Sequence, residues 1–375
     1  MHIVIDAHML GEQEGGNETY IAGLLEGLES VLLPATQVKV TALYSPCYKP
    51  QGNRIRVLSA RLRSKSSIYR LLWEIPLMCH HLRADLLHVT YNAPLFSPCP
   101  FVVTVHDVIF RLYPEYFTPR VRMLLTTLVP FSMWRATFIL TDSEASKQDI
   151  VRYYPFVQNK IVVIPVAAGP VATTQPDYLK AEKYIQGRKF ILSVGSVQPR
   201  KNVLRLIQAY ILLRQKEATN VRLIIVGRSG WQGSQIQKLA LHSPYADDII
   251  FTGYLDDAVL AALYRKCAVF VYPSLYEGFG LPVLEAMACG AAVITSNVSS
   301  LPEIAGDAAL LVDPYSVEQI SAAINQVLSN DALREELILR GLRQASRFSW
   351  KRTAQETLAV YERAVQVQRK YGKLW

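Results

Sequence analysis

Two glutamates, Glu277 and Glu285, flank a glycine-rich turn that leads into a helical pattern. The first carboxylate can accept hydrogen bonds from the hydroxyls of a bound sugar, and the second can accept from the diol of a ribose. Backbone N–H groups of the turn lie between them, where the start of a helix favours phosphate. The residues of the turn are Gly278, Phe279, Gly280 and Leu281. Either glutamate alone would be an ordinary solvated residue, but the spacing and the glycines together predict a binding site.

A pair of cations follows a strand that we expect over residues 190–194. Gly195 and Ser196 end this strand, and Arg200 and Lys201 precede the next helical pattern. An arginine binds phosphate bidentately and a lysine supplies a compact charge, so the pair suits two phosphates. Pairs of this kind are also common on protein surfaces, which is the alternative interpretation.

Two features of the first half of the chain also favour ligand binding. Gly15, Gly16 and Asn17 precede a helical pattern, and free N–H groups at such a helix start attract phosphate. They do not form a G-x-G-x-x-G dinucleotide fingerprint, and a plain turn is the alternative. His106 leaves an expected buried strand at residues 101–105, where it can bond a sugar hydroxyl or exchange a proton. A structural histidine is the alternative there.

The elements that must position these residues alternate between short apolar strands and helices. We expect strands at 2–6, 38–44, 86–89, 101–105, 137–140 and 161–164, and again at 190–194, 221–226, 249–251, 268–272, 291–294 and 309–312. Continuously apolar strands separated by helices indicate parallel sheets covered on both faces. Two such series predict an α/β protein with two Rossmann-like, doubly wound domains facing a cleft, and ligands bind outside the carboxyl ends of such strands.

The break between the two series sets the expected domain boundaries. Residues 1–170 form the N-terminal domain, residues 171–189 a linker rich in Ala, Thr, Pro and Lys, and residues 190–345 the C-terminal domain. An amphipathic helix near residues 350–368 lies in a final segment, 346–375, that we expect to return to the N-terminal domain.

Composition narrows the function classes. The chain has 375 residues, of which 50% are hydrophobic, and a net charge of +9, which excludes a disordered or fibrous protein. No membrane span or export signal is recognisable, and five cysteines without a C-x-x-C pair predict a reducing, cytoplasmic location. The basic charge does not predict nucleic-acid binding, because no basic motif with interleaved aromatic residues is present.

The basic charge is concentrated in parts of the chain. Residues 49–83 contain eight basic residues and one acid, Glu74, and the uncharged run 123–134 lies between Arg122 and Arg135. In the simple interpretation, the basic residues lie on solvated faces and the uncharged run is a core helix. Peripheral contact with an anionic membrane, on its cytoplasmic face, is the other, and composition leaves both open.

The motifs resemble those of the retaining glycosyltransferases of family four, which have the GT-B fold. The resemblance is carried by Gly195 with residues 199–202, by residues 251–254 and 272–274, and by the block 277–290 followed by residues 301–303. It implies transfer of a sugar from a nucleotide diphosphate sugar with retention at the anomeric carbon and without a metal or cofactor. No D-x-D metal signature is present in the chain.

The resemblance also assigns roles to individual residues. Glu277 would hold donor-sugar hydroxyls, Glu285 the ribose, and residues 278–281 the sugar and phosphates. The main chain around Tyr254 and Leu255 would contact the base. Arg200 and Lys201 would neutralise the leaving diphosphate, with Gly15 and Gly16 closing on it. Many relatives have an arginine where this chain has Ser196, so Arg228 is an additional candidate for the diphosphate.

The sequence is less informative about the identity of the donor and the acceptor. We expect transfer of a hexose, with UDP-glucose favoured and GDP-mannose the alternative, to a growing glycan or a lipid-linked acceptor. A nucleotide-sugar epimerase of the same fold and a non-catalytic subunit that binds nucleotide sugars are the remaining alternatives.

Overall fold

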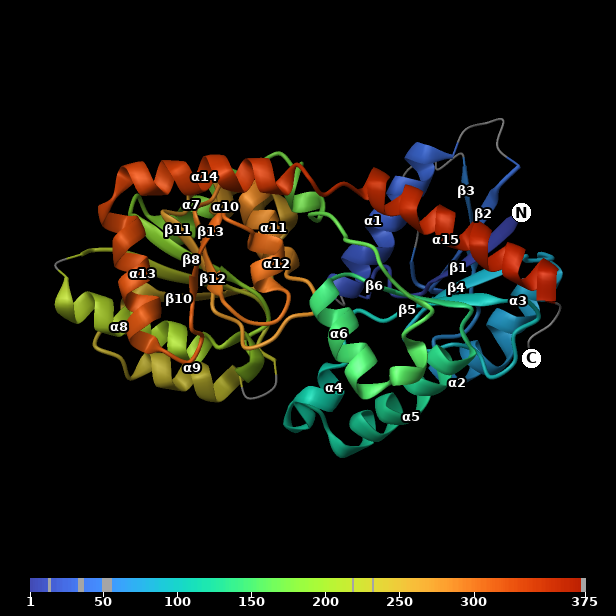
Figure 1. Cartoon of the computed structure of the whole chain (residues 1–375). Helices are drawn as coiled ribbons and strands as arrows, with labels where there is room; N and C mark the ends of the chain where they lie inside the picture. The colour runs from blue at the N-terminus through green and yellow to red at the C-terminus, as the bar shows by residue number, and fades with distance from the viewer. Residues whose placement is uncertain (13–14, 33–36, 49–55, 218, 231–232, 372–375) are drawn as a thin grey trace. The chain divides into compact units, whose positions relative to one another are not determined.

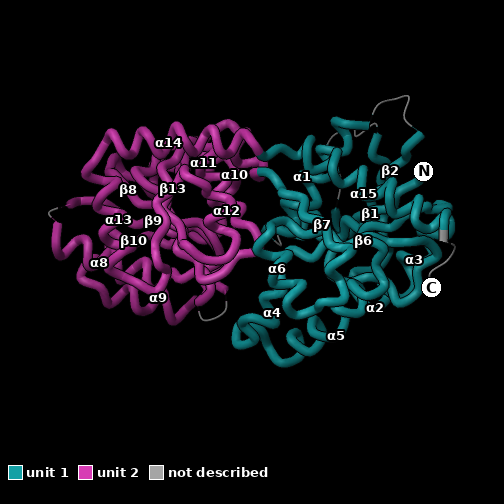
Figure 2. The backbone as a smooth tube through the Cα atoms, in the orientation of Figure 1, with its two compact units in different colours: residues 1–167, 348–375 teal, residues 168–347 magenta. Residues whose placement is uncertain are grey.

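A computed structural model describes residues 1–12, 15–32, 37–48, 56–217, 219–230 and 233–371 of the chain. The chain divides into two compact units. Unit 1 consists of residues 1–167 and 348–375, and unit 2 of residues 168–347 (Figure 2).

Unit 1 is built on a parallel sheet of seven strands in the order β3-β2-β1-β4-β5-β6-β7. Its strands are β1 (His2–Ala7), β2 (Lys39–Tyr44), β3 (Val57–Arg61), β4 (Leu86–Thr90), β5 (Phe101–Thr104), β6 (Phe138–Thr141) and β7 (Ile161–Val163). Its helices are α1 (Gly16–Val31), α2 (Ser67–Tyr69), η1 (Arg70–Glu74), α3 (Ile75–His81), α4 (Ile109–Leu112), η2 (Pro114–Tyr116), α5 (Pro119–Arg135), α6 (Glu144–Tyr153), η3 (Pro155–Val157) and α15 (Trp350–Tyr371).

Unit 2 contains a parallel sheet of six strands in the order β10-β9-β8-β11-β12-β13. Its strands are β8 (Phe190–Val194), β9 (Arg222–Val226), β10 (Ile249–Gly253), β11 (Val269–Tyr272), β12 (Val293–Ser296) and β13 (Ala309–Val312). Its helices are η4 (Pro170–Ala172), α7 (Tyr178–Ile185), η5 (Pro199–Lys201), α8 (Val203–Lys216), α9 (Gly233–Leu241), η6 (Ala246–Asp248), α10 (Asp257–Lys266), α11 (Leu281–Ala288), α12 (Leu301–Ala305), α13 (Val317–Ser329) and α14 (Asp331–Ala345).

The twelve expected strands are all present, and both sheets are parallel and doubly wound, as predicted. One strand was not predicted. β3 lies at the edge of its sheet, and its residues 58–61 are partly or fully exposed, so it lacks the continuous apolar run that marks the inner strands.

The segment 171–189 is not a linker. It contains η4 and α7, and α7 buries Ala181 and Ile185. The side chain of Asp177 caps α7, and its N–H donates to the carbonyl of Ala258 at the start of α10. The Arg265 side chain holds the carbonyls of Ala172 and Thr174. The segment is therefore an integral part of unit 2.

The last helix returns to unit 1, as expected from its amphipathic pattern. α15 packs along α1, where two glycines of α1 make room for it (Figure 1). A methyl group on Gly23 would lie 2.0 Å from the Trp350 ring, and one on Gly27 would lie 2.2 Å from the Trp350 carbonyl. Thr353 fastens the start of α15 by donating to the carbonyl of Pro165 at 2.8 Å.

The two faces of the unit 1 sheet are covered by different helices. Side chains of α3, α5 and α6 join the strands in one apolar cluster, which contains Ile75, Cys79, Val129, Met133 and Ile150. In Figure 1, α15 runs alongside α1, and α2 and α5 lie below β4 and β5. In the described part of the chain, no helix is long and apolar enough to span a bilayer.

Candidate functional site

The strand order of unit 2 reverses between β8 and β11. From this point the chain proceeds through β9 and β10 on one side and through β12 and β13 on the other. Loops at the carboxyl ends of two such strands diverge and leave room for a ligand. Here the two loops are joined by hydrogen bonds: Leu275 N–H donates to the Arg200 carbonyl at 2.9 Å, and the Asn202 amide donates to the Pro273 carbonyl at 2.9 Å.

Glycines set the backbone of the first loop. Gly195 has a φ of 148° and Gly227, at the end of β9, a φ of 146°, which other residues rarely adopt. A methyl group on Gly227 would lie only 2.1 Å from the Gly195 carbonyl oxygen. The ends of β8 and β9 can therefore approach this closely only with glycine at position 227. This approach fixes the direction in which the loop leaves β8 toward Arg200.

Arg200, Lys201 and Glu277 form one ionic cluster at this point. Lys201 Nζ donates to Glu277 Oε1 at 2.7 Å, and Arg200 Nη1 donates to Glu277 Oε2, also at 2.7 Å. Two hydroxyls complete the shell: those of Tyr272 and Ser274 donate to Oε1 at 2.9 and 2.6 Å. The structure therefore brings together three residues that the sequence predicted for the site from two distant motifs.

Glu277 is only 8% exposed, and the cluster keeps its carboxyl group ionised. Burial alone would raise the pKa of its carboxyl group, but Arg200 and Lys201, with hydrogen bonds from Lys201 and Ser274, lower the pKa to about 2. Burial and the neighbouring carboxylate raise the pKa of the Tyr272 hydroxyl well above its ordinary value. Glu277 is thus ionised and Tyr272 neutral at every physiological pH, and the cluster carries a formal charge of +1.

The turn after Glu277 leads into α11 with its backbone fixed by serines. Ser299 Oγ accepts from Glu277 N–H at 3.0 Å, while Ser300 Oγ contacts the carbonyls of Glu277 and Phe279 at 2.9 and 2.6 Å. Gly280, with a φ of 116°, occupies the N-cap of α11, and no side chain caps this end. The N–H groups of Val283 and Leu284 donate to the Gly280 carbonyl at 3.0 and 3.3 Å, so the first turn is closed by backbone hydrogen bonds.

Glu285 lies one turn into α11 and is partly buried. The hydroxyl of Tyr264 donates to its Oε2 at 3.3 Å. Burial raises the pKa of Glu285 to about 7, although the bonds to Tyr264 and to the Gly169 backbone oppose this shift. In contrast to Glu277, Glu285 has a pKa that is set by burial and not by a neighbouring cation, so its carboxyl group titrates near neutral pH.

The remaining predicted residues of unit 2 lie at the next strand ends. The Arg228 guanidinium stacks on the ring of Tyr254 at 5.2 Å, and Tyr254 is 59% exposed. Gly227 N–H donates to the Gly253 carbonyl, which connects the ends of β9 and β10. Leu255 follows in the turn before α10 and is partly buried.

In unit 1, His106 follows β5 and pairs with a residue that the sequence had not singled out. His106 Nδ1 lies 2.5 Å from Asp142 Oδ2 at the end of the neighbouring strand β6. Burial would lower the pKa of His106, but the Asp142 carboxylate outweighs it and the net pKa is raised. Nε2 is buried and has no hydrogen-bond partner among the described residues.

The ring of His106 contacts a chain of hydrogen-bonded polar side chains that lies on the sheet face covered by α1 and α15. Tyr20 of α1 meets the His106 ring edge to face at 4.8 Å. The Tyr20 hydroxyl bonds Thr104, Thr104 bonds His88, and His88 bonds Tyr361 of α15, at 2.9, 2.8 and 2.5 Å. Burial lowers the pKa of His88 to about 3, so this chain is neutral.

Gly15 precedes α1, which begins at Gly16, as the sequence predicted. Gly15 has a φ of 63°, no side chain caps the helix, and a methyl group at Gly15 would contact nothing within 4 Å. Asn17 lies in the first turn and is partly exposed. Residues 13–14 of this loop lie outside the described residues.

Four residues that orient the predicted ones were missed by sequence reasoning: Ser299, Ser300, Tyr264 and Asp142, while Tyr272 and Ser274 were included only as part of the motif 272–274, without a role of their own. Asp142 directly follows an expected strand, as His106 does, and neighbouring parallel strands end at the same edge. That signal was available. Ser299 and Ser300 lie three and four residues beyond the end of β12, and Tyr264 lies within α10, so none of these three directly follows a strand.

Two family models match the chain, one for each unit. The model described as "Glycosyl transferases group 1" matches residues 175–344, and the model described as "Glycosyltransferase Family 4" matches residues 15–167. Together they cover most of the chain.

Among curated proteins, the chain is 39% identical to the O-antigen chain mannosyltransferase B of Escherichia coli over 70% of each protein. It is 34% identical to the serotype-specific mannosyltransferase WbdA of Escherichia coli over 72% of this chain but only 34% of that protein. Among solved structures, the sucrose-phosphate synthase of Thermosynechococcus elongatus has the same fold, with a TM-score of 0.76, 20% identity, and coverage of 98% of this chain and 99% of that one.

Proposed function

Because the chain belongs to glycosyltransferase family four and has the GT-B fold, we propose that it transfers mannose from GDP-mannose to a growing glycan or a lipid-linked acceptor. The sequence alone favoured UDP-glucose. The relatives support the mannosyl alternative, since the two described above are an O-antigen chain mannosyltransferase and a serotype-specific mannosyltransferase. Five free cysteines are consistent with action in the cytoplasm.

The observation that carries this proposal is the cluster of Arg200, Lys201 and Glu277 at the strand-order reversal. Departure of a nucleoside diphosphate concentrates negative charge on its oxygens, and cations already fixed in place stabilise that charge without reorganising. Glu277 holds both cations at 2.7 Å, so they are oriented before any ligand arrives. We propose that they neutralise the diphosphate, that no metal is required, and that the anomeric configuration is retained.

The two glutamates take different roles in this proposal. Glu277 accepts from donor-sugar hydroxyls as well as from its four protein donors. Glu285, near the start of α11, accepts from the ribose diol, and the glycine turn at the start of α11 lies toward the phosphates. Tyr254 and Leu255 lie at the base end, and we place Arg228 with them rather than at the diphosphate, because its guanidinium lies over the Tyr254 ring.

His106 contributes from unit 1. With Nδ1 hydrogen-bonded to Asp142, Nε2 is the ring atom left to bond a sugar or acceptor hydroxyl. The raised pKa means that this nitrogen carries a proton over a wider pH range than in a free histidine. We propose that His106 supports transfer and contributes little to nucleotide affinity.

A donor screen tests the proposal. Thermal unfolding is measured with GDP, UDP, GDP-mannose and UDP-glucose, and each sugar donor is then supplied with a lipid-linked glycan acceptor extract. We expect GDP and GDP-mannose to raise the midpoint selectively and only mannose to be transferred, with or without a chelator. Selective binding of UDP-glucose and transfer of its glucose would show that UDP-glucose, not GDP-mannose, is the donor. Turnover of a nucleotide sugar without an acceptor would indicate an epimerase. Binding without turnover would indicate a non-catalytic subunit.

A further inference from the structure

Large apolar side chains are exposed on one side of unit 1. Of twelve exposed large apolar side chains in the described residues of this unit, ten lie on α2, η1, α3, α5 and the loop after β4. We call them the apolar patch: Ile68, Tyr69, Trp73, Leu77, Leu95, Phe96, Val121, Met123, Leu124 and Trp134. The other face of the same sheet is covered by α1 and α15, and the described residues of these two helices contribute none.

The patch lies on a single side of the fold. Ile75 and Cys79 of α3 and Val129 and Met133 of α5 pack into one apolar cluster against the sheet, so both helices cover the same sheet face. The loop is joined to the end of α5, because the Arg135 guanidinium donates to the carbonyl of Leu95. The outward sides of these segments consequently face solvent together.

α5 shows the arrangement most clearly. It buries Val129 and Met133, whereas Met123 and Trp134 are 67% and 65% exposed. The uncharged run 123–134, for which the sequence left a core helix or a membrane contact open, is thus core on one side only. A surface helix normally exposes few large apolar side chains, whereas α5 exposes Val121, Met123, Leu124 and Trp134 beside its arginines.

Basic residues accompany the patch almost without acids. Residues 117–141 contain three arginines, at positions 120, 122 and 135, and no acidic residue. In residues 63–83 the exposed charges are Arg63, Lys65 and Arg83, since Arg70 is buried beside Asp6 and Glu74 is buried and accepts from the backbone N–H of Arg63. Two exposed tryptophans and one exposed methionine with arginines nearby suit a surface that has an apolar interior and anionic headgroups.

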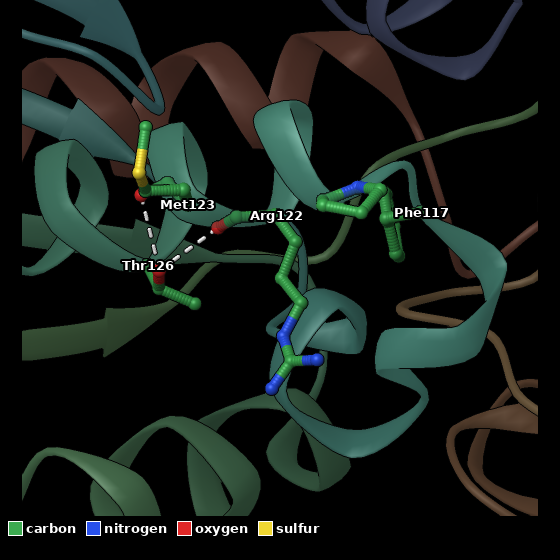
Figure 3. A pocket seen from close by; sticks show the side chains of 5 residues that line it. Phe117, Arg122, Met123 and Thr126 are labelled. Carbon is green, nitrogen blue, oxygen red and sulfur yellow. Dashed lines mark hydrogen bonds between the residues drawn. The ribbon is translucent and has the colours of Figure 1, made fainter.

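A pocket at the start of α5 has the same composition. It has a volume of 310 Å³ and is lined by Phe117, Pro119, Arg122, Met123 and Thr126 (Figure 3). The Thr126 hydroxyl donates to the carbonyls of Arg122 and Met123, so it is satisfied within the helix. Apolar walls with one guanidinium fit a lipid headgroup phosphate and the first carbons of its chains.

We propose that the apolar patch docks unit 1 on a bilayer that contains anionic phospholipid. A second copy of this chain fits the surface less well, since a two-fold interface would set the same arginines against each other. The inference does not depend on the proposed transferase activity, because lipid binding needs no sugar donor.

Flotation with vesicles tests the docking. The full chain is mixed with vesicles of phosphatidylcholine alone or with ~30% phosphatidylglycerol, which supplies the anionic surface. We expect at least roughly tenfold stronger binding to the anionic vesicles, and a loss of similar size in Met123→Gln/Trp134→Gln and in Arg120→Gln/Arg122→Gln. Matched controls on unit 2 are Leu239→Gln/Leu241→Gln, whose leucines are 56% and 72% exposed, and Lys216→Gln/Lys238→Gln. Both should bind like the unsubstituted chain.

Other results would overturn the inference. These are failure of the unsubstituted chain to bind anionic vesicles, equal binding by patch and control variants, or a dimer in solution that Met123→Gln/Trp134→Gln disperses. Nucleotide-induced thermal stabilisation is measured on each variant. It should be unchanged, which verifies that each variant is folded and separates a failure of docking from a failure of the proposed donor site.

Discussion

Replacing Lys201 by Ala tests whether the ionic cluster serves the fold, the reaction or both. The substitution removes one of two cations that contact Glu277 and leaves Arg200 and the hydroxyls of Tyr272 and Ser274 in place. A buried carboxylate that loses part of its pairing is destabilising. The same substitution removes charge that the proposed reaction needs when the diphosphate departs.

The structure gives the size of the stability effect. The pKa of Glu277 falls from its ordinary value of 4.5 to about 2, which corresponds to about 3 kcal/mol of net stabilisation at neutral pH. A lowered pKa contributes stability above pH 4.5, and this stability is lost as the pH falls toward 2. This net value already includes the opposing effect of burial, and the Lys201 and Arg200 distances are equal at 2.7 Å, so Lys201→Ala should cost at least ~1.5 kcal/mol.

A double-substitution cycle separates the two roles. Urea unfolding is followed for Lys201→Ala, Glu277→Gln and the double variant at about pH 7, and transfer rates are measured on the same samples. The neutral amide introduced by Glu277→Gln needs no counter-charge, so we expect the double variant to regain most of the stability lost in Lys201→Ala. Turnover of both variants that lack Lys201 should fall by a factor of about 100 to 1,000, which is typical for loss of one preorganised electrostatic contact.

Two results would refute this reasoning. If Lys201→Ala unfolds at the same urea concentration as the unsubstituted chain, the cluster does not stabilise unit 2. If the double variant regains turnover together with stability, Lys201 acts only by supporting Glu277, and a direct role at the diphosphate is wrong.

Three further predictions concern other parts of the structure. Glu285→Gln should raise the unfolding midpoint at about pH 8 more than at about pH 5.5, because a pKa raised from 4.5 to about 7 destabilises the fold increasingly as the pH rises from 4.5, and fully only above 7; calorimetry should show weaker nucleotide binding by the same variant, and an unchanged affinity would contradict the ribose assignment. Asp142→Asn should lower the pKa of His106 and move the pH profile of kcat to lower pH with unchanged nucleotide affinity, whereas a profile that stays in place would deny Asp142 its positioning role. Gly23→Ala should destabilise unit 1 by about 1–3 kcal/mol, because its methyl group would overlap the Trp350 ring, and Glu26→Ala, on the exposed side of the same helix, is the control; equal unfolding midpoints would show that α15 does not press on α1.

The parts of the fold that were predictable are those with local chemical signals. Inner strands such as β8 are buried on both faces and therefore continuously apolar, whereas β3 at the edge and α7 in the expected linker are not. α7 is short, and its main attachments, to Ala258 and Arg265, come from distant positions. Such pairings leave no periodicity in the sequence.

The candidate site was predictable to a similar extent. Arg200, Lys201 and Glu277 were assigned separately, but their direct pairing was not, since 76 residues separate Lys201 from Glu277. The raised pKa of Glu285 arises mainly from burial, which a single turn of sequence cannot show. The outward apolar side of α5 was equally hidden, because its hydrophobic residues follow no single face.

The return of α15 to α1 has a consequence for how the protein is made. Unit 1 begins the chain, but its Tyr361 and Trp350 are translated only after unit 2, about 180 residues later. At ~5–20 residues per second, the ribosome needs roughly 10–40 s to reach them. During that interval the glycine side of α1 and the buried His88 stand without their partners. The domain that starts first is therefore completed last, and a nascent chain stalled within unit 2 would present an open groove on α1 to chaperones.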